Sequence, residues 1–130
     1  MFRLVKVLNA NNQCEVAKLK FNSSAVIKPG CALSCTSGSL AHASNTVMPD
    51  YIALSSNDDP TCDTVDAMFV TEDMVFKVEY HGSATPYIGM LVGLTTKKNK
   101  MDAVNYNSSG KGTILALDDD NKLVYVRFRK

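Results

Sequence analysis

The chain contains short stretches in which apolar and polar side chains alternate. The clearest stretch covers residues 74–80, where the even-numbered positions Met74, Phe76, Val78 and Tyr80 are apolar or aromatic. The odd-numbered positions between them include charged side chains. Because successive side chains of a strand point to opposite faces, this pattern predicts a strand with one buried face and one face in water. Residues 123–128, near the end of the chain, predict a second strand of the same kind.

Shorter segments with alternating or clustered β-forming residues predict further strands between turn residues. They cover residues 2–8, 14–21, 25–33, 40–43, 51–54, 87–94, 101–106 and 113–117. Within 25–33, Pro29-Gly30 predicts a tight turn, and the polar residues 34–39 predict a loop. An Asn-rich turn at 9–12 predicts that the first two pair as a hairpin, and Asp118 to Asn121 predict the turn of another. No window of 11 or more residues has a 3.6-residue period, so helix is expected to be scarce, with at most one turn around 58–64.

The order of the predicted segments recurs along the chain. Ile27 and Ile88 are 61 positions apart, as are Leu33 and Leu94. The segment 27–33 and the segment 88–94 are each followed by a similar series of short predicted strands. The series predicts an all-β fold, a small barrel or sandwich of many short antiparallel strands, and fits two repeated rounds, although any two β-rich halves can be aligned this loosely. We interpret residues 1–130 as a single β domain with an N-terminal hairpin (1–24), a first round (25–82) and a second round (83–130).

Composition places the chain among ordinary globular proteins. Its 130 residues are 45% hydrophobic and 21% charged, which suffices for one core and argues against disorder. No apolar run reaches the roughly 18 residues that would span a membrane, and the alternating first ten residues lack the apolar centre of a signal peptide. We therefore expect these residues to form a first strand, in a protein that stays in the cytoplasm where it is made.

The net charge of +1 conceals an uneven distribution. Residues 1–49 carry five basic side chains and one acidic, residues 50–79 carry one basic and eight acidic, and residues 80–130 carry eight basic and four acidic. A nucleic-acid-binding domain is usually basic overall. An acidic segment beside basic ones fits a protein that contacts copies of itself or a partner with a patterned surface, although solvated loops produce the same pattern.

Candidate chemistry is sparse. Cys31 and Cys35 have nearly the spacing of metal ligands, but a structural zinc site normally requires a second pair, and Cys14 and Cys62 stand alone. Free thiols are the simpler expectation. His42 lies between two alanines, which predicts a partly buried strand residue better than a catalytic base. We expect no catalytic residues, no metal and no cofactor, and hence no enzyme.

Four segments of the first round resemble the small β-barrel head-decoration proteins, or capsid cement proteins, of tailed bacteriophages. They read Val-Ile-Lys-Pro-Gly-Cys-Ala-Leu (26–33), Gly-Ser-Leu (38–40), Pro-Asp-Tyr-Ile-Ala-Leu (49–54) and Glu-Asp-Met-Val-Phe-Lys-Val (72–78). In that family an apolar stretch leads through lysine to a glycine turn, then to a brief strand, then through a charged turn to an alternating strand. The likeness spans residues 25–82, and the second round echoes it. The charged turn lacks the glycine that the family often has before its glutamate, and residues 2–21 have no counterpart.

The resemblance implies a structural virion protein that binds the outside of a capsid shell and stabilises it. The implied partners are the major capsid protein and, for a homo-oligomer, copies of this chain. Contacts with the capsid or between subunits are expected from the N-terminal hairpin, the loop at 55–66 and the basic turn at 97–100. The residues predicted to make them are Phe2, Arg3, Lys6, Asp58, Asp59, Asp63, Lys97, Lys98 and Lys100.

A nucleic-acid-binding β-barrel is the alternative function. Its basic face would use Lys97, Lys98, Lys100, Arg127 and Arg129, and binding would weaken as salt is added. Oligonucleotide-binding barrels also stack bases on exposed aromatic rings. Here Tyr125 and Phe128 fall on opposite faces of one predicted strand, which suits core packing better than a stacking platform. Nucleic acid is therefore the less favoured partner.

Overall fold

The computed structural model describes residues 1–130 except 9–13, 23, 98–99 and 119–121, and its described residues contain strands and no helix. The expected all-β class is therefore confirmed. The strands are β1 (Arg3–Val7), β2 (Val16–Phe21), β3 (Ala32–Thr36), β4 (Ser39–His42), β5 (Tyr51–Ala53), β6 (Thr64–Phe69), β7 (Met74–Tyr80), β8 (Leu91–Lys97), β9 (Lys100–Tyr106), β10 (Gly112–Leu117) and β11 (Leu123–Phe128).

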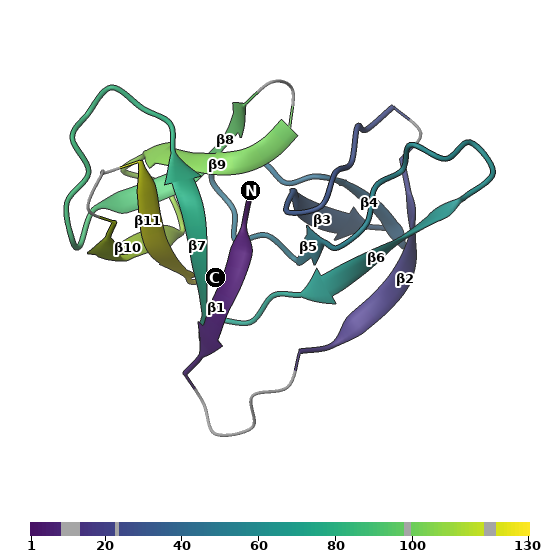
Figure 1. Ribbon diagram of the computed structural model, residues 1–130, viewed down its shortest axis with the longest axis horizontal. Helices are drawn as coiled ribbons and strands as arrows, with labels where there is room; N and C mark the ends of the chain where they lie inside the picture. Colours follow the sequence, from purple (N-terminus) through teal and green to yellow (C-terminus); the bar gives the residue numbers. More distant parts are fainter. Residues whose placement is uncertain (9–13, 23, 98–99, 119–121) are drawn as a thin grey trace.

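Ten of these strands form two closed barrels that lie side by side (Figure 1). The first barrel has the order β2-β4-β3-β5-β6, and the second has the order β7-β9-β8-β10-β11. Adding five to each strand number in the order of the first barrel gives the strand order of the second barrel. In both barrels the first strand pairs in parallel with the third strand along the chain, and all other pairs are antiparallel. The predicted repetition is thus confirmed as two rounds of identical topology.

The boundaries of the rounds differ from those expected. The first round comprises β2 to β6, and β7 opens the second round instead of closing the first. Residues 64–69, expected to lie mostly in a long polar connection, form β6, which closes the first barrel against β2. The expected helical turn around 58–64 is absent from the described residues, since a simple turn there is followed at Thr64 by strand.

The expected N-terminal hairpin is wrong. β1 pairs with β7, which is some 70 residues away along the chain, while β2 pairs with β4 and β6. β1 is thus an eleventh strand that lies against the second barrel, and the chain crosses to the first barrel after it (Figure 1). The expected turn at 9–12 lies outside the described residues, as do residues 119–121 of the turn expected between β10 and β11, although those two strands do pair.

The two barrels share a continuous apolar core. Phe2 is 3% exposed, and its ring packs edge-on against Phe76 and at a tilt against Phe128, with ring centroids 6.2 and 5.8 Å away. The same cluster extends into the first barrel through Ile52 and Met68. A smaller cluster around Ile27 fills the interior of the first barrel. Burial of this shared apolar surface holds the barrels together.

Two glycines serve a tight turn and a close backbone contact. Gly30 has a φ of 88°, and the N–H of Cys31 donates to the carbonyl of Lys28 at 3.1 Å, so the Pro29-Gly30 turn is confirmed. Gly93 lies in β8, where a side chain would come within 2.3 Å of the Asn45 carbonyl oxygen. A strand was expected from residue 87, but it begins only at Leu91, after a turn at Gly89. The predicted loop at 34–39 is also shorter, because β3 continues to Thr36.

Candidate functional site

The histidine and cysteine side chains are placed as structural groups. His42 ends β4, is half-buried as expected, and has Nε2 2.7 Å from the Val26 carbonyl oxygen, which fixes its ring. Cys31 is buried and Cys35 half-buried, and all four cysteines are free thiols. Burial raises the pKa of the Cys31 thiol, which makes it a poor nucleophile. Among the described residues, no group of three or more His, Cys, Asp or Glu side chains could hold a metal ion.

The predicted contact residues of the N-terminal segment divide between core and surface. Phe2 lies in the shared core, so its ring is not available to a partner. Arg3 and Lys6 lie on β1 and are exposed. Sequence alternation alone could not assign Phe2, because it precedes the strand and is buried by residues from both barrels.

The predicted acidic loop lies at the end of the first barrel, and its carboxylates are partly engaged. Asp58 forms an ion pair with Lys28. Asp59 accepts hydrogen bonds from the backbone N–H of Thr61 at 2.9 Å and from its hydroxyl at 2.7 Å, and these bonds lower the pKa of its carboxyl. Asp63 is exposed. With Phe21, Asn57, Pro60 and Cys62, the last two carboxylates line a hollow of about 370 Å³.

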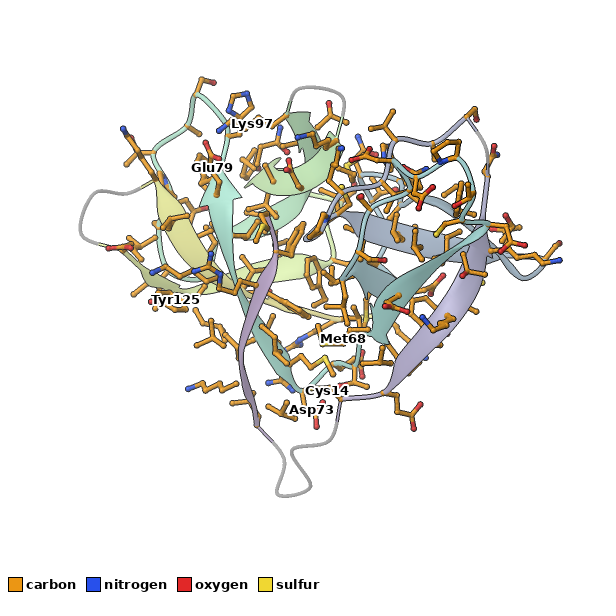
Figure 2. All side chains as sticks on the ribbon, turned by 45° about the vertical axis from the view of Figure 1, so that its right-hand side comes forward. Cys14, Met68, Asp73, Glu79, Lys97 and Tyr125 are labelled. Carbon is orange, nitrogen blue, oxygen red and sulfur yellow. The ribbon has the colours of Figure 1, made fainter. Side chains whose placement is uncertain are left out.

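The predicted basic turn is less available than expected. Lys97 donates to both carboxylate oxygens of Glu79 at 2.7 Å, a contact that lowers the pKa of the glutamate, and Figure 2 shows the two side chains together on the second barrel. Lys100 opens β9 and is half-buried. Lys98 lies outside the described residues. The basic face of the alternative function is likewise partly engaged, because Arg127 Nε donates to the Glu72 carbonyl at 2.6 Å.

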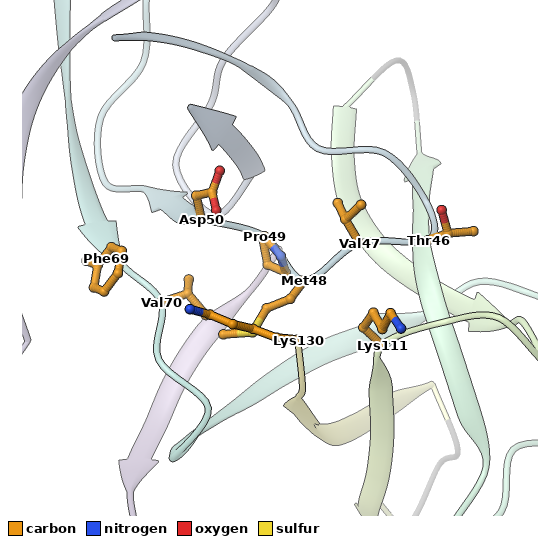
Figure 3. A pocket seen from close by; sticks show the side chains of 9 residues that line it. All are labelled: Thr46, Val47, Met48, Pro49, Asp50, Phe69, Val70, Lys111 and Lys130. Carbon is orange, nitrogen blue, oxygen red and sulfur yellow. The ribbon is translucent and has the colours of Figure 1, made fainter. Parts of the chain in front are cut away.

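A pocket of about 400 Å³ lies where the two barrels meet (Figure 3). Its floor is mainly apolar and comes from the segment before β5 and from the end of β6. The lining residues are Thr46, Val47, Met48, Pro49, Asp50, Phe69, Val70, Lys111 and Lys130. Val47 and Phe69 are 38% and 39% exposed, which is unusual for apolar side chains so close to a core. This pocket could not be predicted from the sequence, because its walls come from four separate segments.

The junction pocket is lined by two lysines and one aspartate, and a second carboxylate, that of Glu72, accepts a hydrogen bond from the backbone N–H of Lys130 at 2.9 Å. Asp50 accepts a hydrogen bond from the backbone N–H of Cys35 at 2.9 Å, so one of its carboxylate oxygens already has a partner within the protein. Lys111 and Lys130 are exposed, and the described residues provide no acidic partner for either ammonium group. An apolar floor beside unpaired cations suits a partner that offers apolar and acidic side chains together.

A second apolar hollow lies on the outer face of the second barrel. Val5 on β1 and Leu115 on β10 are the extra residues of two β-bulges, and they are 47% and 41% exposed. A bulge turns the side chain of the extra residue away from its regular direction. Together with Lys6, Val75, Ala116 and Tyr125, they line a hollow of about 310 Å³. Bulges depend on strand pairing, so alternation along the sequence could not reveal them.

Sequence comparisons place the chain in no known group, because no protein-family model matches it and no curated protein matches its sequence. No described helix is long and apolar enough to cross a membrane. Among solved structures, a similar one is the N base of head fiber gp8.5 of bacteriophage phi29, a crystal structure. The match has a TM-score of 0.60 at 15% identity and covers 90% of this chain and 95% of that chain. The likeness to phage head proteins suggested by the sequence is thus confirmed at the level of the fold, which is similar to that of this head fiber base over most of both chains.

Proposed function

We propose that this protein is a structural component of a phage virion that binds the outside of the capsid and stabilises it. The observation that carries the proposal is the fold match to a head fiber base over nearly the full length of both chains. The match includes both barrels and not a single small barrel, a unit that many unrelated proteins share. In this proposal the protein is made in the host cytoplasm and acts by contact, without catalysis or a cofactor.

The surface of the molecule supports a contact role. The junction pocket and the outer hollow expose apolar side chains beside lysines, a combination typical of surfaces that bind protein partners. A capsid presents the same binding surface many times by symmetry. A modest interface repeated on every copy therefore adds up to substantial stabilisation of the shell. The proposed partner is the major capsid protein, with neighbouring copies of this chain as a second contact.

The engagement of two of the five basic residues named for the nucleic-acid alternative favours this proposal over it. Lys97 is held by Glu79, and Arg127 is held by a backbone carbonyl. Tyr125 lies under the ammonium of Lys77, at 5.6 Å from the ring centroid, so this ring is already covered by a cation. A stacking platform requires an aromatic face that is free to receive a base.

The proposal is tested by co-sedimentation with empty shells assembled from the major capsid protein of the same phage. We expect the protein to pellet with the shells and to saturate at a ratio set by the symmetry of the shell. A protein that stays in the supernatant at every shell concentration would refute the proposal. A parallel titration with single-stranded oligonucleotides at low and high salt tests the alternative, for which we expect no salt-sensitive binding.

A further inference from the structure

The repeat allows each position of one barrel to be compared with its counterpart in the other. Lys20 of β2 pairs with Ser39 and Thr64, and Glu79 of β7 pairs with Ala103 and Leu123. The partners of Lys20 lie in β4 and β6, and the partners of Glu79 lie in β9 and β11, which are the equivalent strands of the second barrel. Lys20 and Glu79 are therefore equivalent positions.

The two equivalent strands differ at one edge. In the second barrel, β9 covers only the last two residues of β7, and β1 covers residues Met74 to Lys77 along the same edge. In the first barrel, β4 covers only Lys20 and Phe21 of β2. No described strand pairs with the remainder of that edge, residues 16–19. The first barrel thus lacks the strand that β1 provides to the second.

The backbone of β2 presents free hydrogen-bonding groups at this edge. The N–H of Phe69 donates to the Glu15 carbonyl at 2.8 Å, so Glu15 directs its backbone groups toward β6. In an antiparallel pair this direction alternates, so Ala17 and Leu19 also face β6. Val16 and Lys18 therefore direct their N–H and C=O groups away from β6, into the open edge. Val75 and Lys77, their counterparts, direct the same groups toward β1.

Side chains of β2 are also more exposed than their counterparts on β7, whose edge is covered by β1. Val16 is 58% exposed, whereas its counterpart Val75, next to β1, is 2% exposed. Ala17 is half-buried, whereas its counterpart Phe76 is fully buried. An edge of this kind, with unpaired backbone groups and an exposed β-branched side chain, is a template for an added strand.

The charge of the edge selects among strands that could add to it. Lys18 and Lys20 are exposed on β2; Lys18 is paired with Asp66 at 2.9 Å, so Lys20 provides the excess positive charge beside the edge. Lysines on an edge oppose pairing with a neutral copy or a basic strand. β1 of a second copy carries Arg3 and Lys6, so it would place like charges against them. A second β2 would set lysines beside lysines. An extended segment with acidic side chains is the complementary occupant.

We propose that the open edge of β2, residues 16–19, binds an extended acidic segment of the capsid subunit by strand addition. This inference rests on the proposed function, because it assigns the partner strand to the shell. The added strand would occupy on the first barrel the place that β1 occupies on the second. Anchoring by backbone hydrogen bonds tolerates sequence change in the partner, whereas the excess positive charge at Lys20 favours an acidic one.

Proline at Lys18 tests the inference, with alanine as its matched control. Lys18→Pro removes the outward N–H, and proline is tolerated where the N–H of an edge strand faces solvent. Lys18→Ala removes the same side chain and keeps the N–H. In the shell co-sedimentation assay we expect the proline variant to bind about tenfold more weakly than the alanine variant, because strand pairing is lost. Equal binding by two folded variants would overturn the inference.

Amide hydrogen exchange provides a second test that needs no variant. We expect the amides of Val16 and Lys18 to exchange at least about tenfold more slowly when the wild-type protein is bound to shells. The amides of Val75 and Lys77, which already face β1, serve as the internal control and should not change. Bound protein with unchanged exchange at Val16 and Lys18 would overturn strand addition. Failure of the wild-type protein to bind shells at all would instead overturn the proposed function.

Discussion

Lys18 lies directly opposite Asp66 across β2 and β6, with Nζ 2.9 Å from Oδ1, and the equivalent pair in the second barrel is Lys77 opposite Tyr125. The lysine is common to both positions, but the residue directly opposite changes from an aspartate to a tyrosine, and Lys77 pairs instead with the carboxylate of Asp118 at 3.4 Å. Each barrel thus keeps a cross-strand contact at this position while the chemistry has diverged. The contact is a detail of the repeat that strand order alone does not reveal.

Removal of the Lys18 side chain is expected to leave stability nearly unchanged. The ion pair with Asp66 is exposed, and exposed pairs gain little because water screens them. Thermal unfolding of Lys18→Ala should give a midpoint within about 2 °C of the wild type. A much larger loss would show that Lys18 supports the barrel itself, and the variant could then no longer serve as a binding control.

Removal of the Phe2 ring is expected to destabilise the protein strongly. Phe2 is packed between Phe76 and Phe128 in the shared core, so Phe2→Ala leaves a cavity. The free energy of unfolding should fall by about 3–5 kcal/mol in a denaturant titration. Arg3→Ala, one position along and exposed, is the matched control and should change it by less than about 0.5 kcal/mol. Similar small losses in both variants would contradict the placement of Phe2 in the core.

The ion pair of Glu79 with Lys97 makes a pH-dependent contribution to stability. Hydrogen bonds from Lys97 lower the pKa of Glu79 below its ordinary value of 4.5 in the folded protein. The contribution is therefore complete above pH 4.5 and is lost as the pH falls through the lowered folded-state pKa. Since the pair is partly exposed, the contribution should be at most about 1 kcal/mol.

Thermal unfolding of wild type and Glu79→Gln between pH 7 and pH 2 measures this contribution. We expect the wild type to be the more stable protein at neutral pH and the difference between the two to shrink below pH 4.5. A difference that stays constant or grows on acidification would show that the carboxylate charge of Glu79 is not what stabilises the contact.

Glycine at position 30 is expected to be required for both conformation and space. Its φ of 88° disfavours any residue with a side chain, and an added Cβ would come within 3.2 Å of the Met1 backbone. Gly38 has a similar φ of 79° with nothing within 4 Å, so Gly38→Ala measures the conformational cost alone, about 1–2 kcal/mol. Chemical denaturation should show a larger loss for Gly30→Ala. Equal losses would mean that Met1 moves aside without cost.

The junction pocket is expected to contribute charge-dependent binding to shells. Lys111→Glu reverses an unpaired cation at its rim and should weaken co-sedimentation, whereas Lys111→Arg preserves the charge and should bind as the wild type does. Raising the salt concentration should reduce the difference between the two variants. Equal binding by both variants at low salt would place the capsid contact elsewhere on the molecule.

The sequence predicts most strands because alternation is a local property. Residues 74–80 and 123–128 were predicted with their observed bounds or within one residue of them. β6 was missed because Asp66 and Ala67, both poor strand formers, interrupt an apolar pattern that is too short to stand out. The partner of β1 could not be predicted, since the pairing of Leu4 with Phe76 joins residues that are far apart in the chain.

The surface features escaped prediction for the same physical reason. The exposure of Val5 and Leu115 depends on bulges that exist only once neighbouring strands are paired. The junction pocket exists only once the two barrels are packed together, and the burial of Phe2 depends on the same packing. The sequence therefore predicts that charged side chains such as Asp63 and Lys6 are exposed, but it does not predict the hollows beside them.

The most direct test of the central claim is the quantity of this protein in purified virions of the phage that encodes it. Quantitative mass spectrometry of gradient-purified particles would give the ratio of this chain to the major capsid protein. We predict many copies per particle, in a fixed ratio that matches a set of symmetry-related sites on the shell. Absence of the chain from intact virions, together with its presence in infected cells, would contradict its assignment as a structural virion protein.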